Sequence, residues 1–233
     1  MSSGKLYLIP IPISEGDRDS LSAEVKSTVP ALRYYFVENI RTARRFIKSI
    51  YPEANIDAIQ FSEIDKHKGP DLPLLRNWLK QGQDIGVMSE SGCPGIADPG
   101  AELVAVAQEL NITVVPLTGP SSLLLALMAS GFNGQSFCFN GYLPVKEPMR
   151  SKEIKAFEQQ SQKLKQTQLF IETPYRNNNL VDDLLKCCND STKLCIAFNI
   201  TGSDQFIKTK TIKQWKQSKP TLGKQPCVFL FLA

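Results

Sequence analysis

The sequence predicts two α/β domains, the first of which is built on a mainly parallel sheet. In the first half, short apolar runs alternate with segments whose apolar residues recur at helical spacing. Strands that are separated by helices pair in parallel, because each helix carries the chain back along the sheet. The length of 233 residues also exceeds the usual ~100–150 of one domain. A turn-rich segment at 118–122 separates the halves, so we expect domains at 1–116 and 117–233.

The first domain is expected to alternate strands and helices. One helix begins after Ser20 and ends before Pro30, since the residue before a proline disfavours helix. Asn39 caps a second helix, in which apolar side chains recur from residue 40 to residue 50. Apolar residues at helical spacing predict two more helices, at 74–79 and 103–110. The expected strands are the short apolar runs at 6–9, 34–37, 58–61, 84–88 and 112–116.

The second domain is expected to be more mixed. It begins with a nearly all-apolar helix that ends at Ser130. Further helices are expected at 150–165 and 176–188. The expected strands lie at 137–139, 169–171, 194–198, 206–209 and 228–232.

Composition excludes several classes of protein. The 27 basic and 23 acidic residues give a net charge of +4, which permits an anionic partner without requiring one. The longest apolar run, at 123–129, is too short for a bilayer span, and prolines interrupt the apolar start, so we expect neither a membrane protein nor a secreted one. Six cysteines without a C-x-x-C pair indicate reduced thiols in a cytoplasmic protein. His67 is the only histidine, so we expect no metal site and no serine-hydrolase triad.

The segment 89–100 is the most informative stretch, with three glycines and two prolines in twelve residues. It lies between an expected buried strand and a helix. In open α/β sheets, ligands bind at the carboxyl ends of the strands, where glycines let backbone N–H groups approach a carboxylate or a phosphate. The alternative is a tight connection, in which Asp98 caps the helix and Pro99 takes its first position.

A second loop of this kind lies at 119–122, where Ser121 and Ser122 stand at a helix start. The two hydroxyls can bind a ligand or cap the helix. Two such loops at equivalent strand ends indicate a shared ligand cleft. No two of the 14 glycines are separated by one residue and no G-x-x-x-x-G-K-[ST] occurs, so the NAD and P-loop fingerprints are absent.

These motifs resemble those of the tetrapyrrole methylase superfamily, whose members use S-adenosylmethionine. Residues 89–100 match the family loop S-D-A-G-x-P-x-x-x-D-P-G except at Glu90 and Ser91. The sequence is most similar to the branch that methylates the ribose of a cytidine in small-subunit ribosomal RNA. The likeness extends, in family order, to residues 6–13, 38–42, 65–68, 119–120, 139–144 and 171–176.

The resemblance implies two α/β domains with a mixed sheet in the second, and the cofactor S-adenosylmethionine in the interdomain cleft. It also implies a homodimer. The residues that it places around the cofactor are Pro12, Cys93, Ile96, Ser121, Ser122, Tyr175, Asn199, Ile200 and Pro226.

The sequence also departs from this branch. The family's A-R-E-L-T-K is replaced at 197–202, its G-E-x-V at 224–228, and a Gly-Asn after Pro12 by Ser14 and Glu15. Three functions therefore stay open. The first is methylation of RNA, with the ribose 2′-hydroxyl of a ribosomal RNA cytidine as the leading acceptor. The others are methylation of a small molecule such as a tetrapyrrole, and cofactor or RNA binding without catalysis.

The expected chemistry needs a general base. The sulfonium of S-adenosylmethionine already activates the methyl group, whereas a ribose hydroxyl is a weak nucleophile. The candidate bases are Glu38, Glu90 and His67. Glu38 is best placed, at the end of a strand, although it can instead help to cap the following helix. His67 lies between two lysines, where the alternative is a solvated role.

Basic residues supply the expected RNA contacts. Residues 205–224 contain six lysines and no acidic residue. Such a run can follow a phosphate backbone, and the alternative is an ordinary lysine-rich surface. Arg41 can likewise bind a phosphate or cover a helix face. The substrate-binding candidates are Arg41, Lys208, Lys210, Lys213 and Lys216.

Overall fold

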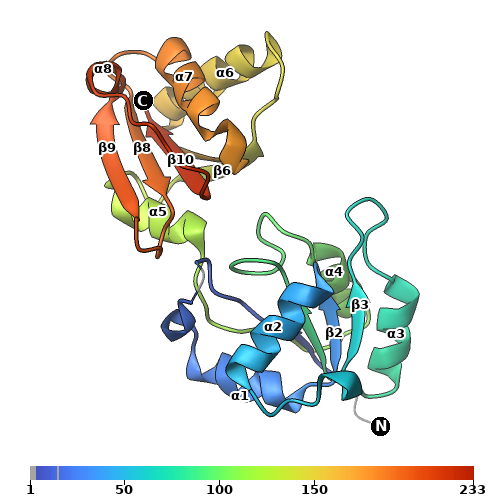
Figure 1. Ribbon diagram of the computed structural model, residues 1–233. Helices are drawn as coiled ribbons and strands as arrows, with labels where there is room; N and C mark the ends of the chain where they lie inside the picture. The colour runs from blue at the N-terminus through green and yellow to red at the C-terminus, as the bar shows by residue number, and fades with distance from the viewer. Residues whose placement is uncertain (1–3, 15) are drawn as a thin grey trace. The chain divides into compact units, whose positions relative to one another are not determined.

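The computed structural model describes residues 4–14 and 16–233, and the chain divides into two compact units (Figure 1). The first unit ends at Ser121 and the second begins at Ser122, within the turn-rich segment 118–122. Each unit has its own sheet and its own buried apolar clusters. No helix in the described part of the chain is long and apolar enough to span a bilayer.

The first unit has a five-stranded sheet in the order β3-β2-β4-β1-β5. Every neighbouring pair is parallel, which confirms the expected parallel sheet. All five carboxyl ends therefore lie at one edge. The strands are β1 (Leu6–Leu8), β2 (Tyr34–Val37), β3 (Gln60–Glu63), β4 (Ile85–Met88) and β5 (Val114–Pro116).

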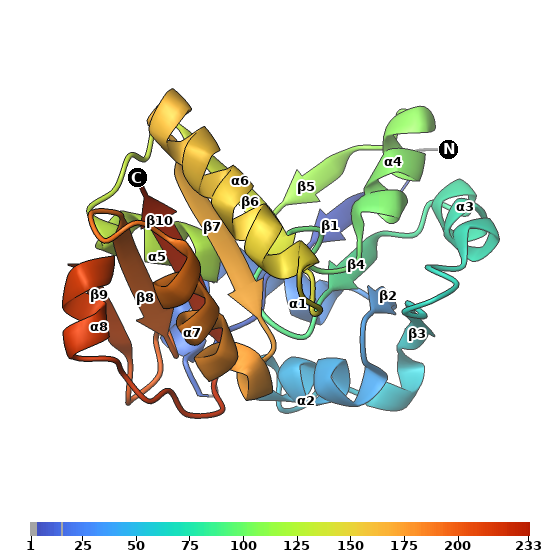
Figure 2. The ribbon, with the colours of Figure 1, turned by 90° about the horizontal axis from the view of Figure 1, so that it is seen from above.

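Helices cover both faces of this sheet. Two buried clusters form because neighbouring strand residues point to opposite faces. Tyr35 and Val37 pack against α1 and α2, whereas Phe36 packs against α3 and α4. Figure 2 shows the two pairs of helices on opposite faces of the sheet. The helices are α1 (Ala23–Ala31), α2 (Ile40–Ile50), α3 (Leu72–Lys80) and α4 (Ala101–Glu109).

Several expected boundaries in the first unit are wrong. The cap of α1 is Ser22, whose hydroxyl accepts from Val25 N at 3.3 Å, and the helix includes Pro30. The proline is tolerated because it lies in the last turn, where little helix remains to be disrupted. The strand expected from residue 58 is β3, which begins at Gln60, because residues 56–58 form a 3₁₀ turn.

The second unit has a mixed sheet in the order β6-β7-β10-β8-β9, as expected. Only β6 and β7 pair in parallel, and the other neighbours are antiparallel. The strands are β6 (Phe137–Tyr142), β7 (Thr167–Glu172), β8 (Lys193–Phe198), β9 (Phe206–Thr211) and β10 (Cys227–Leu232). The helices are α5 (Ser122–Ser130), α6 (Met149–Leu164), α7 (Asn177–Cys187) and α8 (Ile212–Gln217).

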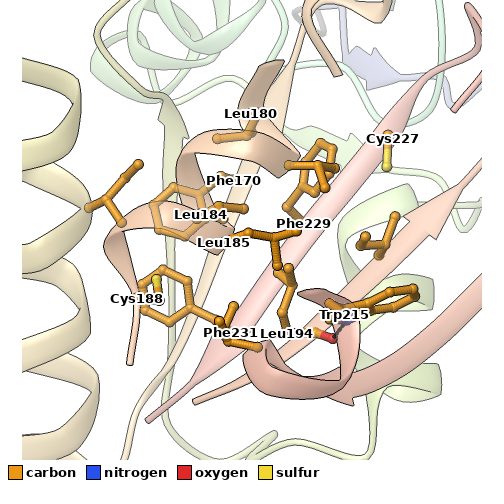
Figure 3. Packing of buried hydrophobic residues seen from close by; sticks show 14 of the residues in the cluster. Phe170, Leu180, Leu184, Leu185, Cys188, Leu194, Trp215, Cys227, Phe229 and Phe231 are labelled. Atoms are coloured by element: carbon orange, nitrogen blue, oxygen red, sulfur yellow. Dashed lines mark hydrogen bonds between the residues drawn. The ribbon is translucent and has the colours of Figure 1, made fainter. Parts of the chain in front are cut away.

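The core of the second unit lies between its sheet and the helices α6, α7 and α8 (Figure 3). Phe170 and Phe231 pack 5.2 Å apart between ring centroids. The helix α8 was not expected from the sequence. It is short, but Thr211 and Gln214 form a capping box, and Trp215 donates from Nε1 to Leu194 O at 2.9 Å. This buried anchor places the lysines of α8 on the outside.

A buried ionic cluster closes the end of β7. Glu172 lies 3.4 Å from Arg150 and 2.7 Å from Arg176, and Arg150 also lies 2.8 Å from Asp183. The side chains of Glu172 and Arg150 are almost fully buried, so their charges need these partners. Part of the family likeness at residues 171–176 therefore has a structural role, since Glu172 and Arg176 form an ion pair at the carboxyl end of β7.

Candidate functional site

The loops at the carboxyl edge of the first sheet are joined to one another. Ile11, after β1, exchanges two backbone hydrogen bonds with Gly92, after β4, at 2.9 and 3.1 Å. Gly119, after β5, packs so closely that a Cβ there would lie 2.2 Å from Pro10 Cγ, so only glycine fits. The loops after three strands therefore form one continuous surface.

The segment 89–100 bends sharply on itself. Gly92 has a φ of +69° and Gly95 a φ of +81°, conformations that favour glycine. The Cys93 thiol donates to Pro120 O at 3.3 Å and so ties this loop to the segment 119–122. Burial, with the nearby charge of Asp98, raises the pKa of this thiol, which indicates a packing role and not a reactive one.

The alternative in which Asp98 caps the following helix is wrong. Gly100 occupies the cap position and α4 begins at Ala101, so Asp98 does not cap α4 and Pro99 is not its first residue. The turn at Gly95, whose N–H donates to Pro99 O at 3.1 Å, leaves Asp98 close to other acidic side chains instead.

Three carboxyl groups gather at this edge of the sheet. Glu38 follows β2, and its Oε2 accepts from the backbone N–H of Glu90 at 3.1 Å. Glu90 Oε1 in turn accepts from the Thr42 hydroxyl at 3.3 Å. Burial, followed by the negative charges of Glu38 and Glu90, raises the pKa of Asp98 to about 6. Asp98 is therefore a site residue that the sequence analysis missed, although it lies in the most informative loop.

Glu38, the best placed of the candidate bases, is nearly buried and held by a hydrogen bond. Its side chain is 11% exposed, and Lys66 lies 3.8 Å away. It does not cap α2, because Asn39 Oδ1 accepts from Thr42 N at 3.1 Å. The expected cap at Asn39 is thus confirmed, and the carboxylate of Glu38 keeps one oxygen toward the fixed N–H of Glu90. This fixed orientation favours proton transfer to or from a bound substrate.

His67 lies in the exposed loop after β3. Asp65 Oδ1 accepts from the backbone N–H groups of His67 and Lys68, each at 2.8 Å, and these bonds lower the pKa of Asp65. The loop forms one wall of a cavity of about 380 Å³, and the other wall is segment 98–102. His67 and Asp98 therefore line the same cavity, so His67 stays a candidate base.

We expect Asp98→Asn to stabilise the protein above pH 6. The ordinary pKa of an aspartate is 3.8, and that of Asp98 in the folded protein is about 6. Between these pH values Asp98 is protonated more fully in the folded protein than in the unfolded one. The free energy of unfolding therefore falls as the pH rises through this window. Asparagine does not titrate, so the variant does not show this pH dependence. At pH 8 we expect its free energy of unfolding to exceed that of the wild type by about 1–2 kcal/mol, a value already reduced for the partial exposure of Asp98. Below pH ~4 we expect no difference.

Urea unfolding of both proteins across this pH range measures the effect. Asp57→Asn is the matched control, because Asp57 is exposed and lies at the opposite edge of the sheet, before β3. A stability difference between wild type and Asp98→Asn that is independent of pH would contradict the assignment of the shift to Asp98.

The first five expected cofactor residues along the chain, the last of which already belongs to the second unit, lie on the joined loops or directly follow them. Ile96 is 53% exposed, unusual for an isoleucine in so constrained a loop. Pro12 is half-buried beside the Ile11–Gly92 bridge. Ser121 ends the first unit, and Ser122 is the first residue of α5 in the second. Neither hydroxyl has a hydrogen-bond partner among residues 4–14 and 16–233, so both can bind a ligand.

The expected cofactor residues of the second unit gather at one edge of its own sheet. The register pairs Cys227 with both Glu172 and Phe198, so the segments beyond these strand ends are neighbours. Asn199 N donates to Pro226 O at 2.9 Å. Tyr175 is 79% exposed at this edge, whereas Ile200 is buried. Their role in cofactor binding stays a prediction.

In the folded unit, acidic residues offset part of the positive charge of the lysine run 205–224. Lys216 Nζ lies 2.6 Å from Asp190, and Lys219 pairs with Asp182. Lys210 lies over the Trp215 ring, 4.6 Å from its centroid, and Lys208 and Lys213 are exposed. Acidic residues from α7 and the turn after it thus partly neutralise the run, and its role in binding stays a prediction.

Comparison with known proteins gives one family. The family model described as Tetrapyrrole (Corrin/Porphyrin) Methylases matches residues 6–216. The Ribosomal RNA small subunit methyltransferase I of Buchnera aphidicola is 30% identical over 91% of this chain and 72% of its own length. The protein of the same name from Escherichia coli O157:H7 is also 30% identical, over 88% of this chain and 68% of its own length.

Solved structures share the fold. The methyltransferase CobJ gives a TM-score of 0.64 at 17% identity, over 99% of this chain and 94% of its own. The uroporphyrin-III C-methyltransferase of Thermus thermophilus was solved in complex with S-adenosylhomocysteine. It gives a TM-score of 0.55 at 14% identity, over 98% of this chain and 97% of its own.

Proposed function

The chain belongs to the tetrapyrrole methylase family, and from that premise we propose that it transfers a methyl group from S-adenosylmethionine to small-subunit ribosomal RNA. It is an S-adenosylmethionine-dependent methyltransferase, as the family is. The RNA substrate is supported by the relatives that are named ribosomal RNA small subunit methyltransferases. The acceptor that we propose is the ribose 2′-hydroxyl of a cytidine.

The residues at the carboxyl edge of the first sheet suit the cofactor. S-adenosylmethionine carries an adenine, a carboxylate and a methyl group that its sulfonium already activates. The exposed side chain of Ile96 offers an apolar wall. The hydroxyls of Ser121 and Ser122, which have no hydrogen-bond partner in the described part of the chain, offer polar contacts. The bends at Gly92 and Gly95 bring backbone close to the same surface. We propose that these residues hold the methyl donor.

The observation that carries the proposed chemistry is the position of Glu38. It lies directly after β2, at the edge that carries the proposed cofactor residues of the first unit, and the Glu90 N–H fixes its carboxylate. Transfer would form a bond between the 2′-oxygen and the methyl carbon and break the bond between that carbon and the sulfonium sulfur. The neutral thioether S-adenosylhomocysteine would leave, and the hydroxyl would give up its proton. We propose that Glu38 accepts that proton, with Glu90 and His67 as the alternatives.

Transfer of a labelled methyl group tests the substrate. The acceptors are small ribosomal subunits and their naked RNA, prepared from cells that lack this protein. Label in RNA, located at the 2′-oxygen of a cytidine after digestion, is the expected result. Label only in low-molecular-weight material would instead favour a small-molecule substrate such as a tetrapyrrole. Binding of the cofactor without any transfer would favour a non-catalytic role.

We also propose that the protein is a cytoplasmic homodimer. Leu124 and Met128, one turn apart on α5, are 53% and 78% exposed and give this helix an apolar outer face. Such a face is more typical of a covered surface than of a free one. Light scattering should give twice the chain mass of 25.9 kDa, and a value near the chain mass at micromolar concentration would contradict the dimer.

A further inference from the structure

The solvent face of α2 is basic along one turn. Arg41, Arg44 and Arg45 are all exposed, and their spacing of three and four residues places them on one side of the helix. Together they span about 6 Å along the helix axis. The helix itself contains no acidic residue. We call this set of three residues the arginine face.

The arginine face lines a groove. The groove has a volume of about 520 Å³, and its other lining residues are Asn39, Ile40 and Glu63. Glu63 Oε2 accepts from the backbone N–H of Ile40 at 3.3 Å. The guanidinium carbon of Arg44 lies 5.6 Å from the centroid of the Phe61 ring, a contact that holds the side chain in place.

The three guanidinium groups are free to bind anions. Within the described residues, none of them forms an ion pair. The lysine run differs in this respect, because Lys216 is paired with Asp190 and Lys219 with Asp182. Arginine also binds phosphate through two parallel N–H donors, which lysine cannot do. The stronger candidate for a phosphate contact is therefore in the first unit.

The arginine face also begins next to the candidate base. Glu38 is separated from Arg41 by two residues, and Thr42 of the same helix donates to Glu90. A strand whose ribose is presented to Glu38 must place the adjoining phosphates close by. Along the sequence, Arg41 is the first basic residue after Glu38, and Lys66, whose Nζ lies 3.8 Å from Glu38 Oε1, adds a second positive charge near the candidate base.

We infer that the arginine face binds the phosphate backbone of the RNA substrate beside the methylated nucleotide. The inference rests on the proposed RNA substrate and adds to it the place where the RNA lies. Arg44 and Arg45 carry the contact together with Arg41, and Phe61 supports Arg44. The groove is a positioning surface and does not read the base.

The test compares three variants that each lose two positive charges. The variants are Arg44→Gln/Arg45→Gln, Lys213→Gln/Lys216→Gln, and the control Lys5→Gln/Lys80→Gln, whose residues lie at the opposite edge of the first sheet. Binding to naked small-subunit ribosomal RNA is measured at several salt concentrations. The arginine variant should bind the RNA about tenfold more weakly than the wild type. The slope of the logarithm of the binding constant against the logarithm of the salt concentration should become shallower by about 0.7 for each arginine removed.

Further measurements separate the possible outcomes. Affinity for S-adenosylmethionine should be unchanged in the arginine variant, which also checks that it is folded. Arg44→Lys/Arg45→Lys keeps the charge and should recover much of the salt slope. Wild-type RNA affinity in the arginine variant would overturn the inference, most directly if the lysine variant alone loses binding. Wild-type protein that neither binds nor methylates RNA would instead overturn the proposed function on which the inference rests.

Discussion

Replacing Glu38 by glutamine should lower the rate of methyl transfer by about 10²–10⁴-fold, because the acceptor hydroxyl loses its proton acceptor. The change is nearly isosteric, and a glutamine oxygen can still accept from the Glu90 N–H that now lies 3.1 Å from Glu38 Oε2. The loss should therefore appear in kcat, with little change in the affinity for S-adenosylmethionine or RNA. Single-turnover transfer of a labelled methyl group measures it.

A matched control separates the base from a general loss of charge. Glu24→Gln removes an exposed carboxylate from α1 in the same unit and should leave the rate unchanged. Raising the pH should partly restore transfer in the Glu38 variant, because hydroxide then takes over the proton. Full activity of Glu38→Gln would show that the base lies elsewhere, and Glu90→Gln and His67→Asn would be the next variants to measure.

Local signals decided how far the fold could be predicted. The bounds of β2 and the cap at Asn39 follow from residues next to one another in sequence. The errors arose where two local signals competed. At Pro30 the rule against proline in helices competes with a helix that is already ending, and at Thr211 the neighbouring lysines obscure a capping box.

The candidate site depends on contacts between distant segments, and the sequence shows these poorly. The loop 89–100 could be identified as a ligand loop from its glycines and its likeness to the family. The proximity of Asp98 to Glu38 could not, because it needs the turn at Gly95 and the parallel neighbours β2 and β4. In the same way, Asp190 lies far from Lys216 in sequence and pairs with it only in the folded unit.

Ser121→Trp should abolish the binding of S-adenosylmethionine. Ser121 is half-buried and adjoins Pro120, whose carbonyl accepts from Cys93, so it lies where the loops 89–100 and 119–122 meet. An indole there would obstruct the surface where these two loops meet. Within the described residues 4–14 and 16–233 the Ser121 hydroxyl makes no hydrogen bond, so the substitution should leave the fold intact. Calorimetry should show micromolar affinity, about −8 kcal/mol, for wild type and no measurable heat for the variant.

The smaller replacement Ser121→Ala is the control for steric exclusion. It removes one hydroxyl contact, which typically contributes about 0.5–1.5 kcal/mol, so affinity should fall by no more than about tenfold. Unchanged thermal unfolding of both variants would show that the fold is intact. Because the donor must bind before any acceptor can be methylated, Ser121→Trp should also lose all transfer. Wild-type affinity in Ser121→Trp would exclude the segment 119–122 from the cofactor site and leave the loop 89–100 as the remaining first-unit candidate.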